Sequence, residues 1–130
     1  MSAALVGVLL HFVGDYLIQT DWMAQLKTKR WTPAILHGVT YGVPFLFVTQ
    51  SWLALLVIIG THIIIDHYRL ARHVVWAKNQ LAPREFRYSW AEGSKTGYRD
   101  DAPVWLTTWL MIIADNTIHV TINTLAILYL

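Results

Sequence analysis

Three pairs of histidine and aspartate recur along the chain at a spacing of four residues. On an α-helix this spacing places both side chains of a pair on one face, one turn apart. Neutral imidazole and carboxylate groups are ligands of zinc, manganese and iron. With one further histidine, the candidate ligands are His11, Asp15, His37, His62, Asp66, Asp115 and His119. The pattern indicates a divalent metal site.

The size of this set predicts more than one ion. Seven ligands are too many for one tetrahedral zinc ion and suit a dinuclear centre of zinc, manganese or iron, with an aspartate bridging the two ions. His67 lies outside the set, because on an ideal helix it points about 140° away from His62. Haem held by two histidines is disfavoured, because the repeated carboxylates are poor haem ligands.

The candidate ligands interrupt four long apolar segments, which cover residues 3–19, 33–49, 52–68 and 104–130. Of the 130 residues, 55% are hydrophobic and 14% are charged. A chain this short has too little interior to bury so much apolar material. Each segment is near the length of about 17 to 25 residues that a helix needs to cross the hydrocarbon layer. The composition therefore predicts four transmembrane helices.

The basic residues fall in only two stretches of the chain. Three of the ten lie between the first and second segments, and the other seven lie between the third and fourth. The N-terminal residues, the connection at 48–52 and the C-terminal segment contain no lysine or arginine. Under the positive-inside rule, both basic stretches face the cytoplasm and both termini face outward.

The connection between the third and fourth segments is long enough to form a structure of its own. Apolar residues keep a helical rhythm as far as Leu81, and Pro83 then ends the helix. The following residues are rich in turn formers and aromatics, which predicts a compact cytoplasmic cap. The expected fold is an all-α, four-helix transmembrane bundle that forms one domain over residues 1–130, with helices at 3–19, 33–49, 52–81 and 104–130.

The candidate ligands are expected to share one layer of the membrane. In all three pairs the aspartate lies nearer the cytoplasm, because the fourth helix runs outward whereas the first and third run inward. His37 lies four residues after Pro33, at a similar depth. The fourth helix fits this layer if its first turn, near Val104, lies among the headgroups. Ionisable groups in lipid cost a few kcal/mol each, and a bound metal would compensate for them.

Other features limit the classes of function and partner. The absence of cysteine excludes disulfides and thiolate zinc sites. A formal net charge of +2 is too small to indicate nucleic acid. The bilayer is therefore the expected partner. Four short helices could close into one bundle or pair with a second copy as a homo-oligomer.

Five motifs carry a resemblance to known proteins, and they are HFVGDYLIQTDWMA, LHGVTYG, GTHIIIDHYRLARHVVWAKN, TGYRDDAPVWL and MIIADNTIHVTIN. Together they resemble a small bacterial and phage family of membrane proteins whose function is unassigned, over essentially the whole chain. More loosely, the chain is similar to inner-membrane proteins described as membrane-bound metal-dependent hydrolases. The resemblance implies a metal-binding, four-helix protein of the bacterial inner membrane.

We predict a metal-dependent hydrolase that acts from the cytoplasmic leaflet on a lipid or lipid-linked ester, with a phosphoester favoured. Asp66 and Arg69 are the candidate catalytic residues. A simpler role for Arg69 is to reach the headgroups and neutralise Asp66. Two other classes fit the same residues. The site could transport a divalent metal or protons, or it could be a structural metal site in a protein that binds a partner through its cap.

Overall fold

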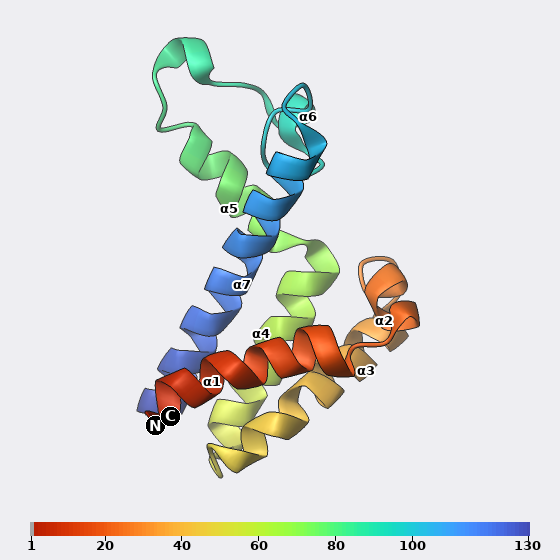
Figure 1. The fold of residues 1–130 in the computed structure, drawn as a ribbon, viewed down its shortest axis with the longest axis vertical. Helices are drawn as coiled ribbons and strands as arrows, with labels where there is room; N and C mark the ends of the chain where they lie inside the picture. The colour runs from red at the N-terminus through yellow and green to blue at the C-terminus, as the bar shows by residue number, and fades with distance from the viewer. Residues whose placement is uncertain (1) are drawn as a thin grey trace. The chain divides into compact units, whose positions relative to one another are not determined.

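The computed structural model describes residues 2–130, and over that range it contains only helices and their connections (Figure 1). The prediction of an all-α fold is therefore confirmed for the described residues. The chain divides into two compact units. Unit 1 consists of the residues up to Tyr68 together with His119–Leu130, and unit 2 consists of Arg69–Ile118.

The first helical segment of unit 1 has two parts. Helix α1 covers Ala3–Phe12, and its N-cap residue Ser2 accepts a hydrogen bond from the Leu5 backbone N–H through its hydroxyl. The chain then widens into a π-helix, η1, at Val13–Ile18. The expected helix at 3–19 is thus helical to Ile18, but its last turns are not α-helical. Single π turns of this kind are frequent at functional sites.

A short helix that the sequence analysis did not predict follows η1. Helix α2 covers Asp21–Leu26, and the Thr20 side chain caps it by accepting a hydrogen bond from the Met23 backbone N–H. Met23 is buried, and α2 packs against the next helix, α3. The first basic stretch is therefore an ordered part of unit 1.

Helix α3 covers Trp31–Gly42 and continues as a 3-10 helix, η2, at Val43–Phe47. Pro44 has no backbone N–H to donate to an α-helical bond, which accounts for the change of helix type. Gly38 and Gly42 lie directly against isoleucine side chains of helix α4. Small residues spaced by four let two helices approach closely, and α3 and α4 form the main helix pair of unit 1.

The expected continuous helix at 52–81 is interrupted at Arg69. Helix α4 covers Trp52–Tyr68, and helix α5 covers Leu70–Asn79. Between them Arg69 has φ 53° and ψ 48°, the left-handed conformation, which ends an α-helix and is costly for a residue with a side chain. The boundary between the two units falls at this residue.

The apolar core of unit 1 joins four elements. Its fully or almost fully buried members come from α3, η2, α4 and the C-terminal helix α7, which covers Val104–Tyr129, and they are Tyr41, Phe45, Ala54, Ile58 and Ala126. This core lies beside the polar residues described below, because Tyr41 contacts both groups.

Unit 2 is a compact unit that hydrogen bonds of its polar side chains help to hold together. It contains α5, a 3-10 turn η3 at Arg84–Phe86, helix α6 at Trp90–Gly93 and the first part of α7. The Tyr88 hydroxyl donates to the Gly97 carbonyl at 2.6 Å, and Asn79 donates to the same hydroxyl at 2.7 Å. Gly97 has φ 85° and lies against the Arg72 carbonyl, where a side chain would be strained.

Helix lengths support fewer membrane spans than the four that the sequence predicts. Among the described residues, α7 is the one helix that is long and apolar enough by itself to cross a membrane. A second span results only if α4 and α5 are taken together across the break at Arg69. The apolar helices at the N-terminal end are shorter than this, so length and composition establish one candidate span, at the C-terminal helix.

Candidate metal centre

Six of the seven predicted ligands come together inside unit 1. They lie on α1, η1, α3, α4 and α7, and they are His11, Asp15, His37, His62, Asp66 and His119. The four histidines are at most 1% exposed, and the two aspartates are 7–8% exposed. Buried His and Asp groups that could hold a metal ion are therefore present, as the spacing predicted.

The closest group consists of two imidazoles and one carboxylate. The Nε2 atoms of His37 and His62 lie 2.9 Å apart. Oδ1 of Asp15 lies 3.1 Å from His37 Nε2 and 3.3 Å from His62 Nε2. Three ligand atoms from η1, α3 and α4 thus converge on one point.

Asp66 completes this group and extends it. Its Oδ2 atom lies 3.3 Å from His37 Nε2 and 3.2 Å from His62 Nε2. Its other oxygen, Oδ1, lies 3.3 Å from Nε2 of His119. Asp15, His37, His62 and Asp66 therefore form a four-ligand set, while His119 contacts the far side of the Asp66 carboxylate.

The spacing of these four side chains fits a tetrahedral ion. Ligands placed about 2.0 to 2.2 Å from a zinc ion lie about 3.3 to 3.6 Å from one another in a tetrahedron. The distances between these ligand atoms run from 2.9 to 3.3 Å, at or slightly below that range. Oδ1 of Asp15 is buried, and although the Nε2 atoms of His37 and His62 lie 3.1 and 3.3 Å away, neither makes a hydrogen bond to it. A cation would supply the partner that this oxygen lacks.

His11 takes a different position from the one predicted. Its Nδ1 atom lies 2.8 Å from the Tyr41 hydroxyl oxygen, whereas Oδ2 of Asp15 is 3.7 Å away. Asn123 on α7 donates to the same hydroxyl at 2.6 Å. The Tyr41 ring stacks on His62 with centroids 3.7 Å apart. His11, Tyr41 and Asn123 thus form a buried hydrogen-bonded layer that holds the His62 ring in place.

The π-helix and a glycine place Asp15 beside this layer. Gly14 lies directly against the Tyr41 ring, where a β-carbon would overlap the ring atoms. Asp15 lies within the widened turn of η1, and the Gln19 side chain donates to its backbone carbonyl at 3.0 Å. The close approach of η1 to α3 therefore depends on glycine at position 14.

Lys27 also belongs to the centre. From the sequence it contributes only to the positive-inside argument, as one of three basic residues between the first and second apolar segments. Its Nζ atom lies 2.6 Å from Asp66 Oδ2 and 3.3 Å from His37 Nε2. Helix α2 carries the lysine back toward α4, and the sequence analysis did not predict that helix. The Thr20 cap followed by Asp21 is the signal that could have indicated it.

His67 holds the segment that carries Lys27. Its Nδ1 donates to the Lys27 carbonyl oxygen at 2.8 Å, and its ring stacks on Trp31 with centroids 3.9 Å apart. Neither contact involves the four-ligand set, so His67 lies outside that set, as predicted.

Two predicted site residues belong to unit 2. The Arg69 guanidinium donates to the Lys95 carbonyl at 2.8 Å, and burial together with the neighbouring Arg72 lowers the pKa of Arg69. Asp115 lies on the part of α7 that unit 2 contains. The catalytic role of Arg69 and the ligand role of Asp115 stay sequence-based predictions.

Comparisons with known proteins give a family without an assigned activity. A family described as "Protein of unknown function (DUF3307)" matches residues 4–87, which include Asp15, Lys27, His37, His62 and Asp66. No curated protein and no solved structure matches the chain.

Proposed function

The chain belongs to the DUF3307 family, and from its own residues we propose that it is a membrane-embedded, metal-dependent hydrolase of lipid-linked phosphoesters. The observation that carries this proposal is the four-ligand set of Asp15, His37, His62 and Asp66, buried between helices that have an apolar exterior. Ionisable groups that are buried inside an apolar exterior are costly, so they indicate a functional site rather than a contribution to packing.

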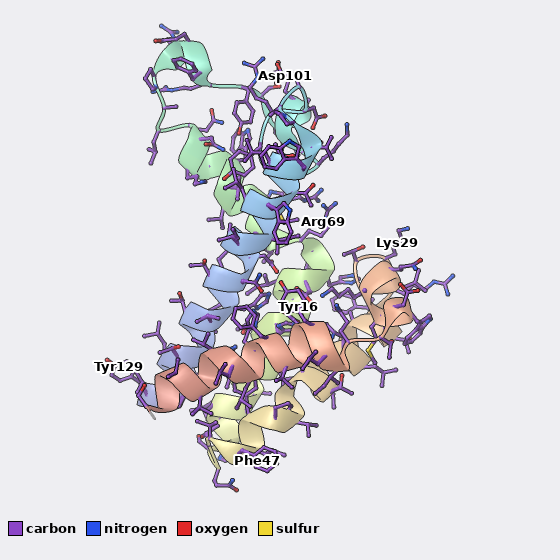
Figure 2. The ribbon with its side chains drawn as sticks, in the orientation of Figure 1. Tyr16, Lys29, Phe47, Arg69, Asp101 and Tyr129 are labelled. Carbon is purple, nitrogen blue, oxygen red and sulfur yellow. The ribbon has the colours of Figure 1, made fainter. Side chains whose placement is uncertain are left out.

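The surface of unit 1 supports a location in lipid. Residues 2–14, 31–65 and 119–130 contain no Asp, Glu, Lys or Arg. Large apolar side chains cover these segments, for example Leu9 at 49%, Leu56 at 59% and Phe47 at 89% exposure. Phe47 and Tyr129 project from this surface (Figure 2). A water-soluble protein of this size rarely exposes so continuous an apolar surface.

The two ends of unit 1 differ in charge. At one end the Ser51 hydroxyl donates to the Leu130 carbonyl, so the connection at 48–52 lies beside the last residue of α7's segment. Residues 31–65 and 119–130, which include both of these segments, contain no Asp, Glu, Lys or Arg. At the other end His67 contacts the basic segment that includes Lys27. The positive-inside rule then puts the Lys27 end in the cytoplasm. The multi-pass location in the bacterial inner membrane is part of this proposal.

Short helices are compatible with this location. Helix α4 has 17 residues, which span about 25 Å at a rise of 1.5 Å per residue. That length is a few ångströms less than the hydrocarbon thickness of about 30 Å, and local thinning of the bilayer accommodates such a difference at modest cost. The centre then lies near the cytoplasmic surface, because Asp66 is two residues from the end of α4.

One ion is the number that the four-ligand set supports. His119 and Oδ1 of Asp66 are two further ligand atoms within unit 1, and the second ion of the dinuclear centre expected from the sequence stays a prediction. When bound, a divalent ion would polarise the phosphoryl oxygen and lower the pKa of a water molecule. Because four protein ligands already fill a tetrahedron, these two oxygens would require a coordination number above four or the release of one carboxylate. The two carboxylates would neutralise its charge, and the Tyr41 layer would keep the His62 ring oriented.

The proposed reaction is the addition of one water molecule across one P–O ester bond. Phosphorus gains the water oxygen, and the bond to the leaving alkoxide breaks with its electron pair. The alkoxide takes a proton from the water. A phosphodiester therefore yields a phosphomonoester and an alcohol, without any oxidant or second substrate.

The first experiment measures the metal content of detergent-purified protein by elemental mass spectrometry. We expect about one zinc, manganese or iron ion per chain in the wild type and none in a His62→Ala, Asp66→Ala double variant. His73→Ala is the matched control, because His73 stacks on Trp90 in unit 2. Wild-type protein without tightly bound metal would contradict the proposal.

The second experiment separates hydrolysis from transport. Turnover of bis(p-nitrophenyl) phosphate by the wild type, lost in the double variant, supports the hydrolase. Metal uptake into liposomes that depends on His62, without phosphodiester turnover, would replace the hydrolase with a transporter. Bound metal with neither activity would favour a structural site.

A further inference from the structure

The centre has a closed side and a side with access to solvent. The four histidines and Tyr41 are at most 1% exposed, whereas Asp15 and Asp66 are 8% and 7% exposed. The Lys27 side chain, which contacts Asp66, is 17% exposed. The surface where Lys27 and the two aspartates meet is therefore the most exposed part of the centre, although Oδ1 of Asp15 itself is buried.

The charges of the metal-loaded centre sum to +1, and the positive charge lies at the opening, the exposed surface where Lys27 meets the two aspartates. Two carboxylates carry a charge of −2, and a divalent ion would cancel it while the imidazoles stay neutral as ligands. The Lys27 ammonium then remains as a net charge of +1. A phosphodiester carries a single negative charge, whereas a carboxylic ester carries none and needs no such cation.

The hydrogen bonds of Lys27 leave donors for a ligand. An ammonium group has three N–H donors. One of them meets Asp66 Oδ2 at 2.6 Å, and the contact with His37 Nε2 at 3.3 Å is the longer one. A metal ion on His37 would take the lone pair of that nitrogen, so at least one donor of Lys27 would be released toward the opening.

The position of Lys27 is held by the backbone rather than by its side chain alone. His67 donates to its carbonyl oxygen at 2.8 Å, and Trp31 stacks on the His67 ring. Met23 anchors α2, which immediately precedes Lys27, in the interior of unit 1. A lysine on such a fixed segment offers its ammonium at a defined place beside the metal.

We propose that Lys27 is a substrate-binding residue that holds a non-bridging phosphoryl oxygen beside the metal, and that it restricts the substrate to phosphodiesters of membrane lipids. This inference rests on the proposed function, because it requires an occupied four-ligand set. His67 is a positioning residue that acts through Lys27.

The test compares binding of three probes to zinc-loaded protein in an uncharged detergent by isothermal titration calorimetry. Dihexanoyl phosphatidylglycerol carries a lipid phosphodiester, dihexanoylglycerol carries the same acyl esters without phosphate, and inorganic phosphate represents a free anion. We expect binding of the phosphodiester only. Equally tight binding of inorganic phosphate would support the anion site and overturn its restriction to lipids, and equal binding of dihexanoylglycerol would overturn both.

The variants test Lys27 itself. Lys27→Met is expected to bind dihexanoyl phosphatidylglycerol at least about tenfold more weakly while it keeps about one zinc ion per chain. Lys27→Arg should recover most of this affinity, because it retains the charge. Lys29→Met is the matched control, since Lys29 is exposed two residues further along the same segment (Figure 2).

Two results would overturn the assignment of Lys27. If Lys27→Met binds the phosphodiester as the wild type does, the lysine is only a counter-ion of Asp66. If Lys27→Met or Lys27→Arg loses zinc, the lysine is required for the metal site rather than for the substrate. Absence of zinc from the loaded wild type is a different result, because it contradicts the proposed function and the inference together.

Discussion

Units 1 and 2 distribute charge in opposite ways. In unit 1 the carboxylates of Asp15 and Asp66 are buried, and most of the exposed side chains are apolar. In unit 2 the ion pairs Lys95–Asp100 and Arg99–Asp101 have exposed partners, with N to O distances of 3.2 Å and 2.6 Å. Residues 69–103 of unit 2 therefore follow the pattern of a protein in water, whereas unit 1, and the apolar helix α7 that both units share, have the pattern expected in lipid. The same chain thus meets two solvents in our account.

The largest effect is expected from removal of a buried carboxylate in unit 1. Asp66→Asn keeps the size of the side chain but removes its charge. Loss of a residue that only supports a metal ligand already lowers metal affinity about 10- to 100-fold. Loss of a ligand charge should therefore lower zinc affinity by at least about 100-fold. Competition with a fluorescent zinc chelator measures this affinity. Asp100→Asn in unit 2 is the control and should leave it unchanged. Similar losses in both variants would remove the distinction between the units.

A charge placed on the exterior should separate the two surfaces next. Leu56→Lys on α4 should disfavour membrane insertion by about 3 kcal/mol, because lysine in the hydrocarbon layer costs that much and leucine is favourable there. Leu81→Lys in unit 2 is the control, since Leu81 is 85% exposed. The fraction of protein that resists carbonate extraction from membranes reports insertion. Equal extraction of both variants would contradict a lipid-facing unit 1.

A smaller effect is expected from deletion of one hydroxyl. Tyr41→Phe removes the group that contacts His11 and accepts from Asn123, so thermal unfolding in detergent should show a loss of about 1 to 3 kcal/mol. Tyr88→Phe in unit 2 removes a hydroxyl that is only partly buried, and a loss of about 1 kcal/mol or less is expected because water can replace the partner. The reverse order would argue against the buried layer in unit 1.

The smallest effect is expected at a surface ion pair. Arg99→Ala removes the two hydrogen bonds to Asp101, at 3.0 Å and 2.6 Å, between exposed side chains. Pairs of this kind contribute about 0 to 1 kcal/mol, so the unfolding midpoint should shift by no more than a few degrees. A larger shift would mean that unit 2 depends on this pair.

Much of the centre follows from local periodicity. The spacing of four residues predicts that His62 and Asp66 lie on the same face of one helix. In the structure they do, and His37 from a different helix lies beside them. The all-helical fold follows from the long apolar segments in the same way. These features depend on residues close in sequence, whose relative directions the α-helix determines.

Features that depend on contacts distant in sequence could not be read in the same way. Lys27 reaches Asp66, 39 positions away, only because α2 folds back. The interruption at Arg69 has no proline or glycine to indicate it, and the π turn at η1 leaves no signal in the apolar pattern. The short α2 was missed because one turn and a half of helix contributes too little periodicity to detect.

X-ray absorption spectroscopy of the zinc-loaded protein tests the central claim most directly. We expect four nitrogen and oxygen ligands at about 2.0 to 2.1 Å, with the outer-shell scattering of two imidazoles, from His37 and His62. The imidazole signal should fall by half in His62→Ala protein that is forced to bind zinc at high concentration. A shell of oxygen ligands without imidazole scattering in the wild type would contradict the four-ligand centre.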